Sequence, residues 1–291
     1  MRFLADGPLI PDELLIARDE GRVVFFCGAG VSKECAGLPL FFELAEDVIK
    51  GLKVDEEEPA CKILKEAQKL NQRPGVGGLI PADRIFGLLE NSFDIKDIEA
   101  EVAKALKPNS SVDLSAHRIM LDLASTPDGN TRIVTTNFDL LFESCEPELT
   151  QSSYPRLPDP HRNDEFKGIV HLHGHVDKDY SKAAGDGFIL SSRGFGRAYL
   201  AEGWATSFIK SVLDKYVVVF IGYTADDPPV QYLLEALNSI SKSPDKIYAF
   251  QDGPVDKAEA KWRPKGVKAI AYNASGDHKT LWKPWSSWKY I

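Results

Sequence analysis

The sequence predicts an α/β fold, in which a Rossmann-like, mostly parallel sheet has helices on both faces and an inserted helical lobe. Four short apolar runs, each readable as a buried strand, end in glycine or polar residues. Between the first two runs, over about residues 52–130, no strand candidate occurs and apolar residues recur at helical spacing. With 291 residues, 43% of them apolar, the chain can bury one large core, or a core and a smaller lobe.

The first strand follows a predicted short helix at residues 11–20 and ends in the glycine turn Gly28, Ala29 and Gly30, with Ser32 close behind. Such a strand–turn–helix unit lets a phosphate approach bare backbone, and the N–H groups at the helix start favour an anion. The third glycine of the usual dinucleotide motif is missing, because Lys33 follows Ser32. An ordinary glycine-rich turn is therefore an open alternative.

The next block is predicted to be helical. Apolar residues recur at helical spacing over residues 56–71 and 82–106, and a glycine-rich break at residues 73–78 indicates a loop between them. We expect this block, at about residues 52–130, to form a helical insertion in one domain that spans residues 1–291. The alternative is that these helices simply cover one face of the sheet.

Polar residues follow each of the later strands. These strands are expected within residues 132–139, 169–176 and 217–228, with two more at residues 246–250 and 267–271. In open parallel sheets ligands bind beyond the carboxyl ends of the strands, where such polar residues meet. A long, proline-rich connection at residues 144–168 either covers that site or is a disordered excursion.

Composition excludes several function classes. The formal net charge of −8 argues against a nucleic-acid-binding surface, which needs clustered lysine and arginine. No apolar stretch approaches the length of a membrane span, and the N-terminus does not resemble a signal peptide. The four cysteines follow no pairing pattern, which favours reduced thiols and a cytoplasmic location.

Tryptophan gathers near the end of the chain, at Trp282, Trp285 and Trp288. Side chains of this size need burial. They pack on the sheet, contact another subunit, or precede a further domain. We expect either a homo-oligomer or a further domain, and in the second case the chain is the N-terminal part of a longer protein.

Four motifs occur in a fixed order: GAGxS at residues 28–32, TTNFD at 135–139, LHG at 172–174 and GYxxxD at 222–227. This order resembles the sirtuin superfamily, and most closely its prokaryotic branch of NAD-consuming defence proteins. The resemblance covers roughly residues 20–240. It implies a Rossmann-like sirtuin fold that takes NAD+ as its substrate.

The chain departs from the deacylating sirtuins at two places. Those enzymes usually carry an acid and an arginine around the phenylalanine after their Gly-Ile-Pro, whereas Leu40, Phe41 and Phe42 follow here. They also usually carry a zinc ribbon with paired Cys-x-x-Cys, which the four cysteines of this chain do not form. The module that helps to seat an acylated peptide is therefore missing, and water becomes the favoured acceptor.

The resemblance also implies the site residues. Asn137 and His173 are the catalytic pair. Asn137 offers a donor and an acceptor for ribose hydroxyls or water, and His173 could take a proton from either. The residues implied to bind NAD+ are Gly28, Ala29, Gly30, Ser32, Thr136, Asp139, Gly222, Tyr223 and Asp227.

Several of these residues have a second interpretation. His171, His173 and His175 alternate, so on one strand they would face the same side and could bind zinc, iron or manganese. The resemblance argues against a metal, since Gly174 should break the alternation and leave His171 and His175 to packing. Asp226 and Asp227 could only cap a helix, as could Ser32. His117 and His161 are expected to be structural or exposed.

The function implied is NAD+ glycohydrolysis to nicotinamide and ADP-ribose, in bacterial antiphage defence by NAD depletion. A phage-derived or partner-protein trigger is expected, with no nucleic-acid or membrane partner and no metal cofactor. One alternative is an NAD-dependent protein deacylase or ADP-ribosyltransferase, and another is a non-catalytic sensor of NAD or ADP-ribose. A metal-dependent hydrolase is the remaining case.

Overall fold

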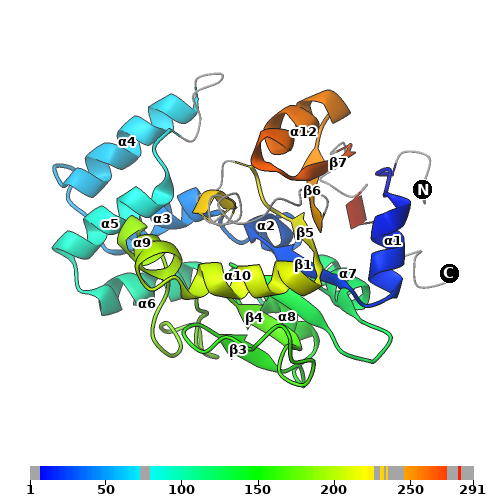
Figure 1. Cartoon of the computed structure of the whole chain (residues 1–291). Coiled ribbons are helices and arrows are strands. Elements are labelled where there is room, and N and C mark those ends of the chain that lie inside the picture. Colours follow the sequence, from blue (N-terminus) through cyan, green and yellow to red (C-terminus); the bar gives the residue numbers. More distant parts are fainter. Residues whose placement is uncertain are drawn as a thin grey trace.

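A seven-stranded sheet forms the centre of the computed structural model, which describes residues 7–72, 79–225, 230–232, 234, 246–273 and 281–282 (Figure 1). The strand order is β3-β4-β2-β1-β5-β6-β7, and each neighbouring pair is parallel. The strands are β1 (Val23–Cys27), β2 (Arg132–Thr135), β3 (Gln151–Ser153), β4 (Gly168–His171), β5 (Val217–Ile221), β6 (Ile247–Asp252) and β7 (Lys268–Tyr272). The predicted α/β class with a parallel sheet is confirmed.

The register brings the carboxyl ends of four strands to one edge of the sheet. Cys27 at the end of β1 pairs with Thr135 of β2 on one side and with Ile221 of β5 on the other. Thr135 in turn pairs with His171 of β4. The polar residues that follow these strands therefore start from adjacent points, as the sequence predicts for a ligand site.

Helices cover both faces of the sheet, because alternate residues of each strand point to opposite sides. Val24, Phe26 and Phe220 share one core with α10 (Trp204–Lys215) and α12 (Val255–Trp262). Val23, Phe25 and Val219 share the opposite core with helices α1 and α7. The helices on this second face are α1 (Asp12–Asp19), α2 (Ala29–Ala36), α7 (Ser115–Ala124) and α8 (Leu141–Cys145).

A helical lobe stands beside the sheet and has its own apolar core, to which Val48, Leu64, Phe86 and Ile98 each contribute from one of its helices (left in Figure 1). Its helices are α3 (Phe41–Gly51), α4 (Pro59–Asn71), α5 (Ala82–Ser92) and α6 (Ile95–Ala105). Helix α7 packs against β1 and β2 rather than in this core.

Two local differences from the sequence analysis have physical causes. The helix expected at 82–106 is two helices, because Asp94 caps a new helix by accepting a hydrogen bond from the Lys96 N–H. The connection at 144–168 contains the edge strand β3, whose short polar sequence carries no strand signal. Between β4 and α10 lie the short helix α9 (Ser192–Gly196) and a one-turn π-helix, η1 (Arg197–Ala201), and the 3-10 turn η3 (Arg263–Lys265) follows α12.

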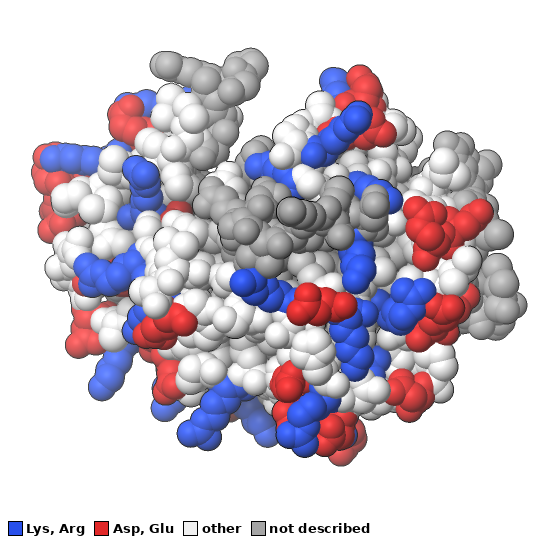
Figure 2. Space-filling model, viewed as in Figure 1, with Lys and Arg blue, Asp and Glu red and all other residues white. Residues whose placement is uncertain are grey.

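The end of the chain is described only in part. Leu281 and Trp282 are buried in the same core as α1 and α7, whereas Trp285 and Trp288 lie outside the described residues. Within the described ranges, no helix is both long and apolar enough to span a bilayer. On the face that Figure 2 shows, basic and acidic side chains are interspersed.

Candidate functional site

The glycines after β1 allow the turn that follows β1 to contact the turn that follows β5. A Cβ on Gly28 would lie 2.6 Å from the Gly222 carbonyl oxygen, and one on Gly30 would lie 2.9 Å from the Gly222 Cα. Gly222, with a φ of +73°, leads out of β5. The Gly28 N–H donates to Ile221 O at 2.8 Å and the Gly30 N–H donates to Gly222 O at 2.9 Å. In this structure these two N–H groups join the turns rather than pointing freely toward a ligand.

The side chain of Asn137 is fixed in one orientation. Its Nδ2 donates to the Gly28 carbonyl at 3.1 Å and to the Ser32 hydroxyl at 3.2 Å, which uses both amide hydrogens. Its backbone N–H donates to the Thr135 hydroxyl at 3.0 Å. The amide oxygen, an acceptor, is therefore the polar atom that Asn137 keeps for a ligand.

Ser32 links three side chains at the base of the site. Its hydroxyl donates to Asp139 Oδ2 at 2.9 Å, accepts from Asn137, and lies 3.2 Å from His117 Nε2. Asp139 Oδ1 accepts from the Leu141 N–H at 3.1 Å, at the start of α8. No side chain caps α2, so Ser32 is not its cap. These contacts make Ser32 the support of the Asn137 amide.

His117 belongs to this group, although no sequence motif predicts it. It comes from α7, is fully buried, and packs its ring edge-on against Phe142. Burial lowers its pKa despite the charge of Asp139, so the imidazole is neutral. A helical histidine before β2 carries no motif, and only the fold brings it to Ser32.

Thr136 and Tyr223 join the ends of β2 and β5. The Thr136 hydroxyl lies 2.9 Å from the Tyr223 hydroxyl, which also donates to the Cys27 carbonyl at 3.1 Å. Two residues with candidate ligand-binding roles thus meet above the end of β1.

His173 lies in an apolar environment. Its Nε2 is 2.8 Å from the Tyr199 hydroxyl, and its ring packs edge-on against Phe195 with centroids 5.2 Å apart. Burial lowers its pKa to about 3. The imidazole is therefore neutral at any pH near 7.

His171 has the opposite environment. Its Nε2 lies 2.8 Å from Glu143 Oε1 and its Nδ1 lies 3.1 Å from the Asn137 carbonyl. Burial pulls its pKa down, but the hydrogen bond and charge of Glu143 outweigh this effect and leave the pKa raised. The structure makes His171 a support for the backbone of Asn137.

The three histidines do not share one strand face. Strand β4 ends at His171, and Gly174 has a φ of +90°, which breaks the alternation. The ring of half-buried His175 packs against His171 with centroids 4.8 Å apart. A search of the described ranges finds no group of three or more His, Cys, Asp or Glu side chains able to hold a metal ion.

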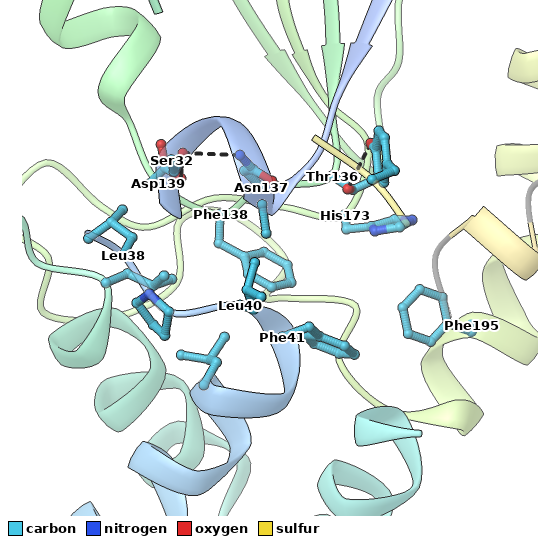
Figure 3. A pocket seen from close by; sticks show the side chains of 15 residues that line it. Ser32, Leu38, Leu40, Phe41, Thr136, Asn137, Phe138, Asp139, His173 and Phe195 are labelled. Carbon is cyan, nitrogen blue, oxygen red and sulfur yellow. Dashed lines mark hydrogen bonds between the residues drawn. The ribbon is translucent and has the colours of Figure 1, made fainter. Parts of the chain in front are cut away.

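These residues border an open cleft of about 680 Å³, which includes its solvent-open part (Figure 3). Polar side chains from the strand ends form one wall, and apolar side chains that include Leu38, Leu40 and Phe41 form the other. The lining residues are Ala29, Ser32, Leu38, Pro39, Leu40, Phe41, Leu44, Leu106, Thr136, Asn137, Phe138, Asp139, His173, Phe195 and Tyr223.

Most of the predicted site residues meet here. Ala29, Ser32, Thr136, Asn137, Asp139, His173 and Tyr223 line the cleft, while Gly28, Gly30 and Gly222 form the touching turns beside it. Asp227 lies outside the described residues. The four sequence motifs do not predict the apolar wall, whose residues come from the segment before α3, from α3 and α9, and from the residues that follow β2 and α6. The motif Gly37-Leu38-Pro39 is the feature of the sequence that indicates this wall.

A protein-family model matches one part of the chain. Residues 131–270, slightly less than half of the chain, match the family model of the SIR2-like domain. This match supports a place in the sirtuin superfamily, and the matched range includes both Asn137 and His173.

The chain is also similar to a much longer protein. It is 32% identical over 289 residues to the "uncharacterized protein y4cA" of Sinorhizobium fredii, which covers 95% of this chain and 23% of that protein. The chain thus spans about a quarter of the length of the curated relative it matches.

Solved structures similar to this chain have low sequence identity to it. A chain from a structural study of the mechanism and regulation of Sir2 enzymes has 14% identity and a TM-score of 0.44, with 97% of this chain and 100% of that chain covered. A Sir2 homologue in complex with NAD has 14% identity and a TM-score of 0.43, with 98% and 96% covered. The strand order and register, rather than these scores, define the fold described above.

Proposed function

We propose that this chain is an NAD+ glycohydrolase that cleaves NAD+ to nicotinamide and ADP-ribose. The observation that carries the proposal is that Asn137 and His173, from the ends of two neighbouring parallel strands, line one cleft. The order of the four motifs and the match to the SIR2-like domain support NAD+ as the ligand.

The residues of the cleft suit the reaction. Breaking the nicotinamide–ribose bond develops positive charge on the ribose, as in glycoside hydrolysis. The amide oxygen of Asn137, for which the described residues provide no donor, can accept a hydrogen bond from a ribose hydroxyl or from the attacking water. The buried carboxylate of Asp139 lies one hydroxyl away from Asn137 and favours a nearby cation. His173 supplies a neutral imidazole that can hydrogen-bond ribose or water.

Water is the proposed acceptor because the chain differs from peptide deacylases at the cleft. The apolar Leu40 lines it at one of the two positions, on either side of the phenylalanine, where deacylating sirtuins usually carry charged residues. The four cysteines, at positions 27, 35, 61 and 145, are free and form no paired motif for a zinc ribbon.

Incubation of the purified protein with NAD+, followed by chromatography of the products, tests this proposal. We expect nicotinamide and ADP-ribose at the same rate with and without an acetylated peptide. Cleavage only with the peptide, or ADP-ribose attached to protein, would support a deacylase or ADP-ribosyltransferase. Binding of NAD+ without turnover would support a sensor.

The biological role that we propose is cytoplasmic antiphage defence by NAD depletion, started by a phage-derived or partner-protein trigger. An activity that destroys NAD+ must be restrained in the healthy cell, and assembly with another copy or a further domain would provide that control. The greater length of the relative supports a further domain. Light scattering and NAD+ turnover, measured together over a range of protein concentrations, test whether activity depends on self-association.

A further inference from the structure

Tyr199 contacts His173 at Nε2, the ring nitrogen for which the structure shows a hydrogen bond. Its hydroxyl lies 2.8 Å from His173 Nε2, and the residue is only 3% exposed. His173 lines the cleft, whereas Tyr199 is not one of the lining residues. The tyrosine therefore contacts the imidazole from the protein side and not from the substrate side.

The position of Tyr199 is tightly set. It lies in η1, the one-turn π-helix between α9 and α10, and such turns often occur at functional sites. The Thr206 hydroxyl donates to the Tyr199 carbonyl at 2.7 Å. The ring packs at 6.3 Å from Phe195 and 6.0 Å from Tyr232, measured between centroids. The phenol is thus fixed before any ligand arrives.

The Tyr199–His173 pair is neutral on both sides. Burial raises the pKa of Tyr199 well above its usual value and lowers the pKa of His173 to about 3. A phenolate–imidazolium pair is therefore excluded near pH 7. The contact is an ordinary hydrogen bond between a neutral hydroxyl and a neutral imidazole.

The direction of this bond follows from counting donors and acceptors. A phenol has one hydrogen to donate, and a buried hydroxyl rarely leaves it unpaired. Within the described part of the chain, His173 Nε2 is the partner found for the Tyr199 hydroxyl. Tyr199 then donates and Nε2 accepts, so the imidazole carries its own hydrogen on Nδ1.

We propose that Tyr199 is a positioning residue that holds His173 as the Nδ1–H tautomer. Nδ1–H is then the polar group of the ring that remains for a ligand, and it is a donor. This inference rests on the proposed function. In it, His173 would donate to a ribose oxygen or to the attacking water, while Asn137 accepts through its amide oxygen. The two residues would hold the ribose and the water by complementary hydrogen bonds.

Nitrogen NMR of the histidine rings tests the tautomer without NAD+. The His173 signals are assigned by their loss in His173→Gln. We expect the wild type to show the hydrogen on Nδ1, and Tyr199→Phe to shift His173 toward the other tautomer or a mixture. The control is Tyr216→Phe, the same change at a tyrosine that is also 3% exposed and whose hydroxyl lies 3.4 Å from Asn163. It should leave the His173 signals unchanged.

Kinetics provide the second readout. Loss of the hydrogen bond should lower kcat about 10-fold in Tyr199→Phe, with a smaller change in KM and none in Tyr216→Phe. Fluorotyrosine incorporated at position 199 keeps the ring and hydroxyl and donates more strongly, so it should shift the Nε2 signal even if Tyr199→Phe fails to fold. A wild-type hydrogen on Nε2, or a Nε2 signal that fluorination does not move, would overturn the proposal. Absence of NAD+ cleavage with the expected tautomer would instead overturn the proposed function.

Discussion

His171 and His173 stand two residues apart and experience opposite surroundings. His171 faces α8, where the carboxylate of Glu143 raises its pKa against the effect of burial. His173 faces η1 and α9, where Phe195 and the Tyr199 hydroxyl surround it and burial lowers its pKa to about 3. Both rings are almost completely buried, so burial alone does not separate them.

The two histidines at and after the end of β4 therefore have different roles: His171 supports the fold, whereas His173 faces the cleft. A histidine paired with a buried carboxylate is held in place and stabilises the chain around it, here the backbone carbonyl of Asn137. A neutral histidine beside an open cleft keeps a polar atom for a ligand. The same residue type therefore serves two purposes, and the neighbouring helix decides which one.

The largest expected effect is on catalysis. His173→Ala and Asn137→Ala should each lower NAD+ turnover on the order of 100-fold or more, because each removes a group that contacts the substrate in the proposed mechanism. Steady-state kinetics measure this loss, and circular dichroism confirms that the variants are folded. Near-normal turnover in both variants would contradict the assignment of Asn137 and His173 as the catalytic pair.

The next effect is on stability. His171→Ala should lower the free energy of unfolding by on the order of 3 kcal/mol, because it leaves the Glu143 carboxylate, whose side chain is only 16% exposed, without its partner. Urea unfolding measures the change. The control is His175→Ala, which removes a half-buried ring and should cost less. Equal effects from the two substitutions would contradict the supporting role of His171.

A smaller effect concerns pH, and the two histidines should act with opposite signs. The unfolded chain protonates His173 near pH 6.5, far above its folded pKa of about 3, so His173 destabilises the fold as the pH falls from about 6.5 toward 3. His171 has a raised folded pKa, so its contribution is full below about pH 6.5 and is lost as the pH rises through the folded value.

Melting temperatures at about pH 8 and about pH 5 measure this contrast. Compared with the wild type, His173→Gln should lose less stability on acidification and His171→Gln should lose more. If both variants shift in the same direction, the two environments do not differ in the way described here.

The smallest expected effect is that of metal removal. The resemblance implies no metal cofactor, so a chelator should leave the melting temperature and NAD+ turnover unchanged. Metal analysis of the purified protein provides the direct check. A stoichiometric metal lost together with activity would make His171, His173 and His175 candidate ligands and would contradict the proposed mechanism.

The main strands and the residues that follow them could be predicted from the sequence, because apolar runs ending in Gly28, Asn137 and Gly222 carry a local signal. His117 and Tyr199 could not, because each comes from a helix without a motif and reaches the site only through tertiary packing. The prediction that the N–H groups at the start of the helix after β1 bind a phosphate did not take account of a tertiary contact. The turn after β5 accepts a hydrogen bond from Gly30, and no local pattern encodes that pairing.

The central claim is that water attacks the ribose in the cleft between Asn137 and His173. Mass spectrometry of the product formed from NAD+ in heavy-oxygen water tests it most directly. We predict ADP-ribose that carries one heavy oxygen, formed by the wild type without any peptide and nearly absent with Asn137→Ala. Unlabelled ADP-ribose, transfer of ADP-ribose to another acceptor, or no cleavage by the active assembly would contradict the claim.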